Sequence, residues 1–180
     1  YVFNYGIIFD TFKIEKLIMK KIVYTFIIYF FTTQVYFAQD VVSTDEKILE
    51  IPVIKLNWIS TYKEALIKSK KEKKPVLIYF TGSDWCGPCK ILVKDLFNTT
   101  RFKDLADKSL ILLEVDIPRR LDIISPEKMF ENMSIQEKYN VKSFPTLMIV
   151  NHRGKKLAEK KGYVMTDYYY PFLQSEIDGY

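Results

Sequence analysis

The chain has 180 residues, and its 27 Lys and Arg against 22 Asp and Glu give a formal net charge of +5. This length suits one ordinary domain with an appendage and excludes two full-sized domains, while 48% hydrophobic and 27% charged residues exclude a mostly disordered chain. The basic excess is modest and scattered along the sequence, so we expect no binding to nucleic acid.

The N-terminal region has the layout of a secretory signal. Two lysines follow Met19, and the run Ile22–Ala38 that comes next carries no charged residue. We therefore predict a signal peptide over residues 19–38, cleaved after Ala38, with an uncleaved membrane anchor or a buried helix as the alternatives. Residues 1–18 have no evident role, and we interpret them as translation upstream of a start at Met19 or as disordered chain.

A secretory signal also bears on location and on domain boundaries. It directs a chain to an oxidising compartment, where a pair of cysteines can act in redox chemistry. We therefore expect an extracytoplasmic protein, periplasmic or secreted, which is membrane-tethered if the signal is not cleaved. Residues 39–51 are polar and irregular, and we interpret them as a lead-in to a folded domain over residues 52–180.

The sequence of that domain alternates predicted helices with predicted strands. Apolar residues recur at helical spacing over Trp58–Lys74, which predicts an amphipathic helix that Pro75 ends. Val76–Phe80 is a continuous apolar run, typical of a strand buried on both faces of a sheet. The helical pattern resumes after the cysteines and continues to about Arg101.

The second half of the domain continues this alternation. The predicted elements are strands over Leu110–Val115, Thr146–Val150 and Leu157–Tyr163, a short helix around Glu127–Asn132, and a final helix from Thr166. Strands that alternate with helices and end in a hairpin indicate an α/β sandwich.

Cys86 and Cys89 lie between a predicted strand and a predicted helix. A thiol in the first turn of a helix faces unpaired backbone N–H groups and the positive end of the helix dipole, and both favour the thiolate that attacks disulfides. A second cysteine three residues later lies one turn along the helix, within reach of a mixed disulfide. Gly87 leaves room for a substrate backbone, and Pro88 suits a helix's first turn. The pattern predicts a redox-active pair.

Two other interpretations of the cysteine pair stay open. A purely structural disulfide would constrain the unfolded chain little, because the loop it closes is so short. Half of a zinc site would need two more ligands, and the only histidine, His152, lies in a predicted turn far along the chain. We therefore expect no metal.

The motif Trp85–Lys90, which reads Trp-Cys-Gly-Pro-Cys-Lys, resembles the active-site motif of the thioredoxin family at all six positions. Phe144-Pro145-Thr146 lies about 55 residues later, just before an apolar run, and resembles the family's cis-proline loop. The resemblance covers roughly Trp58 to Ile177. The residues Thr-Gly-Ser-Asp that precede Trp85 are more similar to extracytoplasmic members of the family than to cytosolic ones. It implies a thioredoxin-like three-layer sandwich, with a central mixed β-sheet flanked by helices.

The resemblance also implies roles for individual residues. Cys86 would attack the substrate disulfide and Cys89 would resolve the mixed disulfide. The residues expected to shape the site are Trp85, Gly87, Pro88 and Lys90, and those expected to bind substrate are Phe144, Pro145 and Thr146. A cis bond is accessible only before proline, which is the physical reason for Pro145. No bound cofactor is implied, because the Cys86–Cys89 disulfide is itself the redox group.

The sequence departs from the family pattern in two places. Cytosolic thioredoxins carry a buried acid in the strand before the motif, and here Tyr79 or Phe80 falls at about that position. Proton transfer would then use Asp84, Tyr79 or water. The connector after the second strand is also longer than usual, and residues 117–133 form an insert of unassigned role.

The expected function is that of a thiol–disulfide oxidoreductase acting on exported proteins. Partners would be disulfide-containing exported proteins and a membrane electron donor, and the protein is expected to be a monomer. The Gly87-Pro88 dipeptide is the reductant's in the family resemblance, and the negative charge of Asp84 disfavours the thiolate, so we expect a reductant. The alternatives are a partner-binding module of the same fold, with secondary redox activity, and a thiol peroxidase.

Overall fold

The computed structural model describes residues 19–30 and 54–180. Contacts divide the chain into two units, residues 1–50 and 51–180. Within the first unit, residues 19–30 form a helix whose side chains are exposed. No helix within the described ranges is long and apolar enough to cross a membrane.

Several predictions about the N-terminal region fall on residues outside the described ranges. They are the interpretation of residues 1–18, the predicted cleavage after Ala38 and most of the lead-in over residues 39–51. The helix at 19–30 covers the first part of the predicted signal peptide. The signal peptide and its cleavage therefore stay predictions.

A five-stranded mixed sheet forms the centre of the second unit, in the order β1-β3-β2-β4-β5. The strands are β1 (Trp58–Ile59), β2 (Val76–Thr81), β3 (Ile111–Asp116), β4 (Thr146–Val150) and β5 (Lys156–Lys161). β3 runs parallel to β1 and β2, whereas β4 is antiparallel to β2 and β5. The central strand, β2, is buried along its whole length and leads directly into the cysteine motif.

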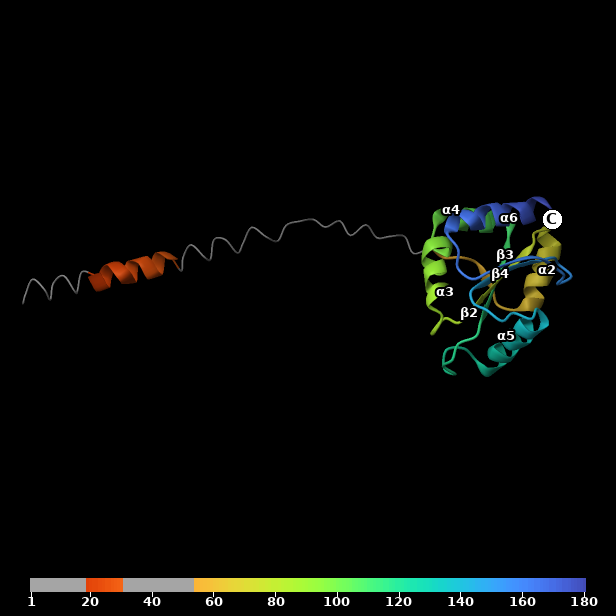
Figure 1. Cartoon of the computed structure of the whole chain (residues 1–180), viewed down its shortest axis with the longest axis horizontal. Helices are drawn as coiled ribbons and strands as arrows, with labels where there is room; N and C mark the ends of the chain where they lie inside the picture. The colour runs from red at the N-terminus through yellow and green to blue at the C-terminus, as the bar shows by residue number, and fades with distance from the viewer. Residues whose placement is uncertain (1–18, 31–53) are drawn as a thin grey trace, which may run out of the picture. The chain divides into compact units, whose positions relative to one another are not determined.

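Helices cover both faces of this sheet (Figure 1). One face carries α2 (Tyr62–Glu72) and α5 (Pro126–Lys138). The other carries α3 (Gly87–Leu92), a π-helical turn η1 (Val93–Phe97), α4 (Thr100–Ser109), a 3₁₀ turn η2 (Thr166–Tyr168) and α6 (Tyr169–Asp178). The predicted three-layer sandwich with a central mixed sheet is confirmed.

The alternation of side chains along β2 divides the core in two. Leu77 and Tyr79 pack toward the α3, α4 and α6 layer, whereas Ile78 and Phe80 pack toward α2 and α5. Consecutive strand residues point to opposite faces, so a run without polar residues fills both cores. The cysteines belong to the first of these cores.

The structure corrects several predicted element boundaries. Trp58–Ile59 form an edge strand rather than the start of a helix, because the Thr61 side chain accepts the Glu64 N–H and begins α2 at Tyr62. The helix predicted to run to about Arg101 is instead α3, the turn η1 and a separate α4.

A side-chain cap explains where α4 begins. The C-terminal helix begins differently from the prediction. The Thr99 hydroxyl accepts the Phe102 N–H at 3.2 Å and starts α4. The final helix, predicted to start at Thr166, begins there with the 3₁₀ turn η2 and becomes α-helical only at Tyr169, and no side chain caps it.

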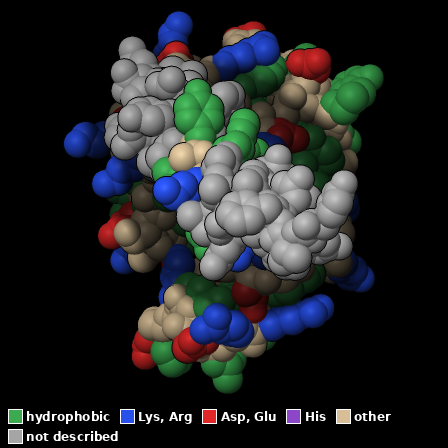
Figure 2. Space-filling model, turned by 90° about the vertical axis from the view of Figure 1, so that its left-hand side faces the viewer, with side chains coloured by type: hydrophobic (Ala, Val, Ile, Leu, Met, Phe, Trp, Pro, Cys, Tyr) green, Lys and Arg blue, Asp and Glu red, His purple; other side chains and the backbone are tan. Residues whose placement is uncertain are grey.

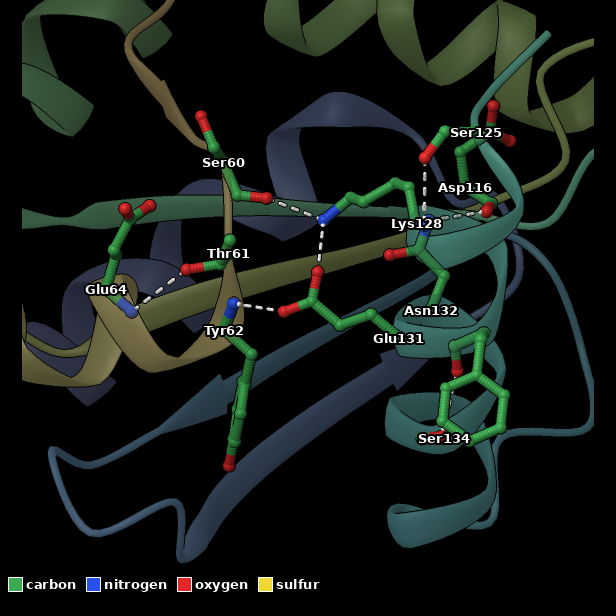
Figure 3. A network of polar contacts seen from close by, with 11 residues as sticks. Ser60, Thr61, Tyr62, Glu64, Asp116, Ser125, Lys128, Glu131, Asn132 and Ser134 are labelled. Atoms are coloured by element: carbon green, nitrogen blue, oxygen red, sulfur yellow. Dashed lines mark hydrogen bonds and ion pairs between the residues drawn. The ribbon is translucent and has the colours of Figure 1, made fainter.

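Polar contacts fasten α5 to the edge of the sheet and to the start of α2 (Figure 3). The Glu131 carboxylate accepts the Tyr62 N–H at 2.9 Å. The Lys128 ammonium donates to the Ser60 carbonyl at 2.6 Å and pairs with Glu131 at 2.9 Å. The second part of the insert, residues 126–133, therefore belongs to an ordered helix that is longer than the predicted 127–132.

Surface charge follows the scattered pattern of the sequence. Where Figure 2 shows described side chains, Lys and Arg lie at several separate places rather than in one patch. All the ion pairs found within residues 54–180 are between near neighbours in sequence, such as Lys103 with Asp107.

Candidate active site

Cys86 and Cys89 form a disulfide in the first turn of α3, with their Cα atoms 5.3 Å apart. Cys86 is the N-cap of the helix, and its sulfur accepts the Cys89 N–H at 3.3 Å. Both residues are buried, with 3% and 1% of their surface exposed. The two cysteines therefore differ little in exposure in this disulfide form. They do differ in their positions in the helix. The N-cap position is the one that helix N–H groups and the helix dipole favour for a thiolate.

Gly82 allows the turn from β2 into this helix. Its carbonyl oxygen accepts the N–H groups of Trp85 and Cys86, at 3.2 and 2.8 Å. A Cβ atom at this position would overlap the indole ring of Trp85. The turn therefore needs glycine because the tryptophan ring packs directly on its backbone.

Trp85 connects the cysteine motif with two distant segments. Its indole N–H donates to the Ile117 carbonyl at 2.9 Å, and its ring centroid lies 5.6 Å from that of Phe144. The Arg119 guanidinium lies over the same ring, 4.7 Å from the centroid. The side chain stays 37% exposed, so one part of it can still face a partner.

The residues before Trp85 hold the start of the insert. The Asp116 carboxylate accepts the N–H and hydroxyl of Ser83, at 2.8 and 2.6 Å. The Asp84 carboxylate in turn accepts the N–H groups of Arg119 and Arg120, at 3.0 to 3.1 Å. Residues 83–85 are thus fastened to residues 116–120 by side chain and backbone.

These contacts determine the charge of Asp84. Partial burial works to raise the pKa of Asp84, but the N–H groups of Arg119 and Arg120 outweigh it and hold the pKa below its ordinary value of 3.8. The carboxylate is therefore charged at neutral pH and is a weak base. The Lys90 ammonium, whose orientation the sequence leaves open, donates to the backbone carbonyl of Asp84 at 3.3 Å.

Tyr79, on the central strand β2, contacts the second cysteine. Its hydroxyl donates to the Cys89 carbonyl oxygen at 3.3 Å. Burial raises the pKa of Tyr79 to about 12. The hydroxyl is thus a neutral donor at physiological pH. Of the three proton-transfer routes, neither Asp84 nor Tyr79 has the pKa of a base near neutrality, which favours water.

The Phe144–Pro145 bond is cis, which is the geometry that the resemblance implied. The Pro145 carbonyl accepts the Gly162 N–H at 2.8 Å, and the Thr146 hydroxyl donates to the Ser143 carbonyl at 2.8 Å. The Phe144 ring against Trp85 brings this loop beside the redox motif. The expected substrate-binding segment is therefore held next to the disulfide.

Gly87 and Pro88 occupy the first turn of α3. A Cβ atom on Gly87 would meet no other atom within 4 Å. There is open space above this position, as the predicted approach of a substrate backbone requires. The structure thus brings together the motif Trp85–Lys90 and the loop Phe144–Thr146, while their roles toward substrate stay predictions.

Sequence reasoning missed the residues that anchor the insert, namely Ser83, Asp116 and Arg119. A signal was present for Asp116, because the carboxyl ends of the parallel strands β2 and β3 meet at one edge of the sheet. A carboxylate that follows β3 must then lie close to residues that follow β2. Arg119 carried no comparable signal, since its position depends on the path of an irregular loop.

Over residues 62–175 the chain matches the family described as the thioredoxin-like domain. The chain belongs to this thioredoxin-like family. The family's fold, redox motif and cis-proline loop all occur here at the positions described above. The family assignment made from the motifs Trp85–Lys90 and Phe144–Thr146 is confirmed.

This chain is similar in sequence to two proteins of Chlamydia pneumoniae. It is 36% identical over 108 residues to the disulfide bond reductase DsbH, a match that covers 60% of this chain and 64% of the relative. It is 26% identical over 100 residues to the thioredoxin-related protein DsbJ, covering 56% of this chain and 28% of that protein. The chain thus spans only part of the length of both relatives.

A solved structure supports the same relationship. The DsbH oxidoreductase superposes with a TM-score of 0.64 at 31% identity, over 72% of this chain and 89% of that chain. The thioredoxin-like fold is therefore shared with a protein of appreciable sequence identity.

Proposed function

We propose that this thioredoxin-like chain is a thiol–disulfide oxidoreductase. The observation that carries the proposal is the disulfide between Cys86 and Cys89 in the first turn of α3, at the end of the central strand. A disulfide there leaves, on reduction, one thiolate at the helix N-cap and a second thiol one turn along.

The reaction is a thiol–disulfide exchange in two steps. The Cys86 thiolate forms a bond to one sulfur of a substrate disulfide, and the other substrate sulfur leaves as a thiolate. Cys89 loses its proton to water and displaces the remaining substrate sulfur, which closes the Cys86–Cys89 disulfide. Two electrons pass from the protein dithiol to the substrate. Trp85 and the cis-proline loop would position the substrate backbone.

We further propose that the direction is reduction. Gly87-Pro88 introduces no positive charge between the cysteines, and Asp84 stays charged close to Cys86. A negative charge disfavours the thiolate, so the reduced form gains less stabilisation than in strong oxidants. The name of the relative DsbH, a disulfide bond reductase, points the same way.

The proposed substrates are exported proteins with disulfides. The signal-like sequence over residues 19–38 supports an extracytoplasmic location, periplasmic or secreted. A reductant there needs electrons from a membrane donor, which would be the second partner of the protein. Both partners follow from this location and are proposed together with it.

Reduction of insulin by the chain, with a dithiol as electron source, tests the activity. We expect wild-type protein to accelerate insulin precipitation and Cys86→Ser to be inactive, while an inactive wild type would contradict the proposal. Equilibration with glutathione buffers tests the direction. A potential near thioredoxin's, about −270 mV, is expected, and a couple more oxidising than about −180 mV would exclude a reductant but keep the oxidoreductase.

A further inference from the structure

Arg119 is a cation at the redox site that forms no ion pair with any residue in the described ranges 19–30 and 54–180. Its side chain is exposed, and its guanidinium lies over the ring of Trp85, 4.7 Å from the centroid. Trp85 directly precedes Cys86. A positive charge that makes no contact ion pair within the described residues therefore lies beside the residue that flanks the proposed attacking cysteine.

The neighbouring arginine is placed quite differently. The Arg120 guanidinium makes two bonds to the Asp122 carboxylate, at 3.1 and 2.5 Å. Of the two adjacent arginines, one is neutralised within its own loop and the other is not. Arg120 is therefore a matched reference for Arg119, with the same charge at the adjacent position.

The position of Arg119 is held by the backbone on either side of it. Asp84 binds the N–H groups of residues 119 and 120, and the Ile117 carbonyl accepts the Trp85 indole N–H. The one acid next to the motif thus binds backbone N–H groups of this loop. Its carboxylate makes no ion pair with the Arg119 guanidinium within the described residues, although the charge of Arg119 helps to lower the pKa of Asp84.

From this arrangement we infer that Arg119 is a specificity-determining residue, which selects polypeptides that carry an acidic side chain next to the cysteine attacked by Cys86. The inference deepens the proposed oxidoreductase function and rests on it. A guanidinium presents several N–H donors in a fork that matches a carboxylate. With one face against the indole, its edge is the part available to a partner.

The exchange itself is unchanged by this selection. The Cys86 thiolate bonds to the peptide sulfur beside the acidic residue, and the second peptide sulfur leaves as a thiolate. Cys89 then displaces the first peptide sulfur, so that two electrons pass from the protein dithiol to the peptide disulfide. Dithiothreitol, which is removed before the peptide is added, supplies the protein dithiol. Arg119 affects only how fast the peptide associates with the protein and how firmly the docked peptide is held.

The test uses the full-length chain, reduced beforehand and freed of excess reductant. Three short synthetic peptides, each closed by a disulfide, carry Glu, Gln or Lys beside the same cysteine. Reactions are stopped with acid, and the dithiol peptide is measured by chromatography. Salt is set to about 0.01 M or about 1 M, where the Debye length falls from about 30 Å to about 3 Å.

Wild-type protein is expected to reduce the Glu peptide about threefold faster than the Gln peptide at low salt, as an exposed ion pair allows. The Lys peptide should be slowest, and the differences should vanish at high salt. Arg119→Gln should remove the preference, whereas Arg119→Lys should keep part of it. Arg120→Gln should leave it intact.

Equal rates for the three peptides with wild-type protein would overturn the inference and leave the oxidoreductase function standing. An equal loss of preference in Arg119→Gln and Arg120→Gln would also overturn it, because net charge alone would then explain the effect. Failure of wild-type protein to reduce any peptide would instead overturn the proposed function. A wild-type midpoint of guanidinium unfolding confirms that Arg119→Gln is folded.

Discussion

Tyr79 shows how one residue changes the chemistry that the fold can use. It is fully buried beneath the redox helix, and its hydroxyl bonds to the Cys89 carbonyl rather than to a sulfur. Because burial raises its pKa to about 12, it holds its proton at any physiological pH. Its role is to support the helix turn that carries the second cysteine, and proton exchange at Cys89 is then expected to involve solvent.

The raised pKa of Tyr79 predicts a specific loss of stability in alkali. Between pH 10 and 12 the unfolded chain loses this proton and the folded chain keeps it, so the free energy of unfolding falls as pH rises through that window. Two pKa units correspond to roughly 2–3 kcal/mol. Guanidinium unfolding at a series of alkaline pH values should show a smaller loss in Tyr79→Phe than in wild type, because Tyr139, Tyr163 and Tyr169, whose pKa values are also raised, still contribute to the loss.

Tyr168, which is 58% exposed, supplies the control for that experiment. Tyr168→Phe removes a phenol that stands in solvent and should leave the alkaline loss of stability unchanged. If Tyr168→Phe and Tyr79→Phe respond alike, burial of Tyr79 is not the cause.

The different places of the two cysteines predict different trapping behaviour. In Cys89→Ala, the Cys86 thiolate can still attack a disulfide, but nothing within the helix turn resolves the product. Non-reducing electrophoresis of this variant, incubated with a disulfide protein, should show a mixed disulfide that dithiothreitol releases. Cys86→Ala should show little, and the opposite result would reverse the two roles.

At the scale of elements, α5 shows how one helix is joined to another. Only a few contacts fasten its first turns to the start of α2, and Glu131 makes two of them, to the Tyr62 N–H and to Lys128. A carboxylate beside the first N–H groups of a helix also complements the helix dipole. One side chain thus caps one helix and anchors another.

Two substitutions of Glu131 should separate these effects. Glu131→Gln keeps an oxygen for the Tyr62 N–H but loses the ion pair with Lys128, and is expected to cost less than about 1 kcal/mol. Glu131→Ala loses both contacts and is expected to cost about 1–2 kcal/mol. Denaturant unfolding of both variants measures the difference, and equal costs would show that the cap contributes nothing.

Strands were predictable from this sequence more closely than helices. Thr146–Val150 matches β4 at both ends, because a strand buried on both faces is an unbroken apolar run. The break between α3 and α4 was not predictable, since Leu96 and Phe97 continue the apolar spacing through the π-helical turn. Trp58–Ile59 carry the apolar pattern of the helix that follows, and only pairing with β3 makes them a strand.

The redox site likewise has parts that could be predicted from the sequence and parts that could not. The motif Trp85–Lys90 and the loop Phe144–Thr146 could be recognised because each is local in sequence. The contacts of Ser83 with Asp116, and of Asp84 with the loop at Arg119, join residues more than 30 positions apart. Their partners are determined by the packing of β2 beside β3 and by the course of a loop, neither of which has a local pattern.

At the scale of the whole molecule, the redox site is built within the 51–180 unit. The segments described above as contacting the cysteine motif lie in this unit, namely the turn at Gly82, the loop at Ile117 and the loop at Phe144. The sheet places β2 between two paired neighbours. The disulfide is thus attached to the most enclosed strand of the fold.

The division of the chain into two units predicts the behaviour of a shortened chain. A chain that begins at Gln39 should unfold in one cooperative transition, with the same guanidinium midpoint as the full chain and the same rate of insulin reduction, because the contacts divide ahead of Ile51. A second chain that begins at Tyr62 lacks β1 and should have a lower midpoint. A lower midpoint already in the Gln39 chain would show that the first unit stabilises the second.

The disulfide joins two residues separated by only three positions, with their Cα atoms 5.3 Å apart. Three residues of fully extended chain span about 10 Å, so reduction lengthens the fully stretched polypeptide by only about 5 Å. A molecule pulled from its two ends would therefore release almost the same contour length in either redox state. The bond lies within a single helix turn and carries no mechanical load between elements. The protein can therefore open and close it while every strand stays in place.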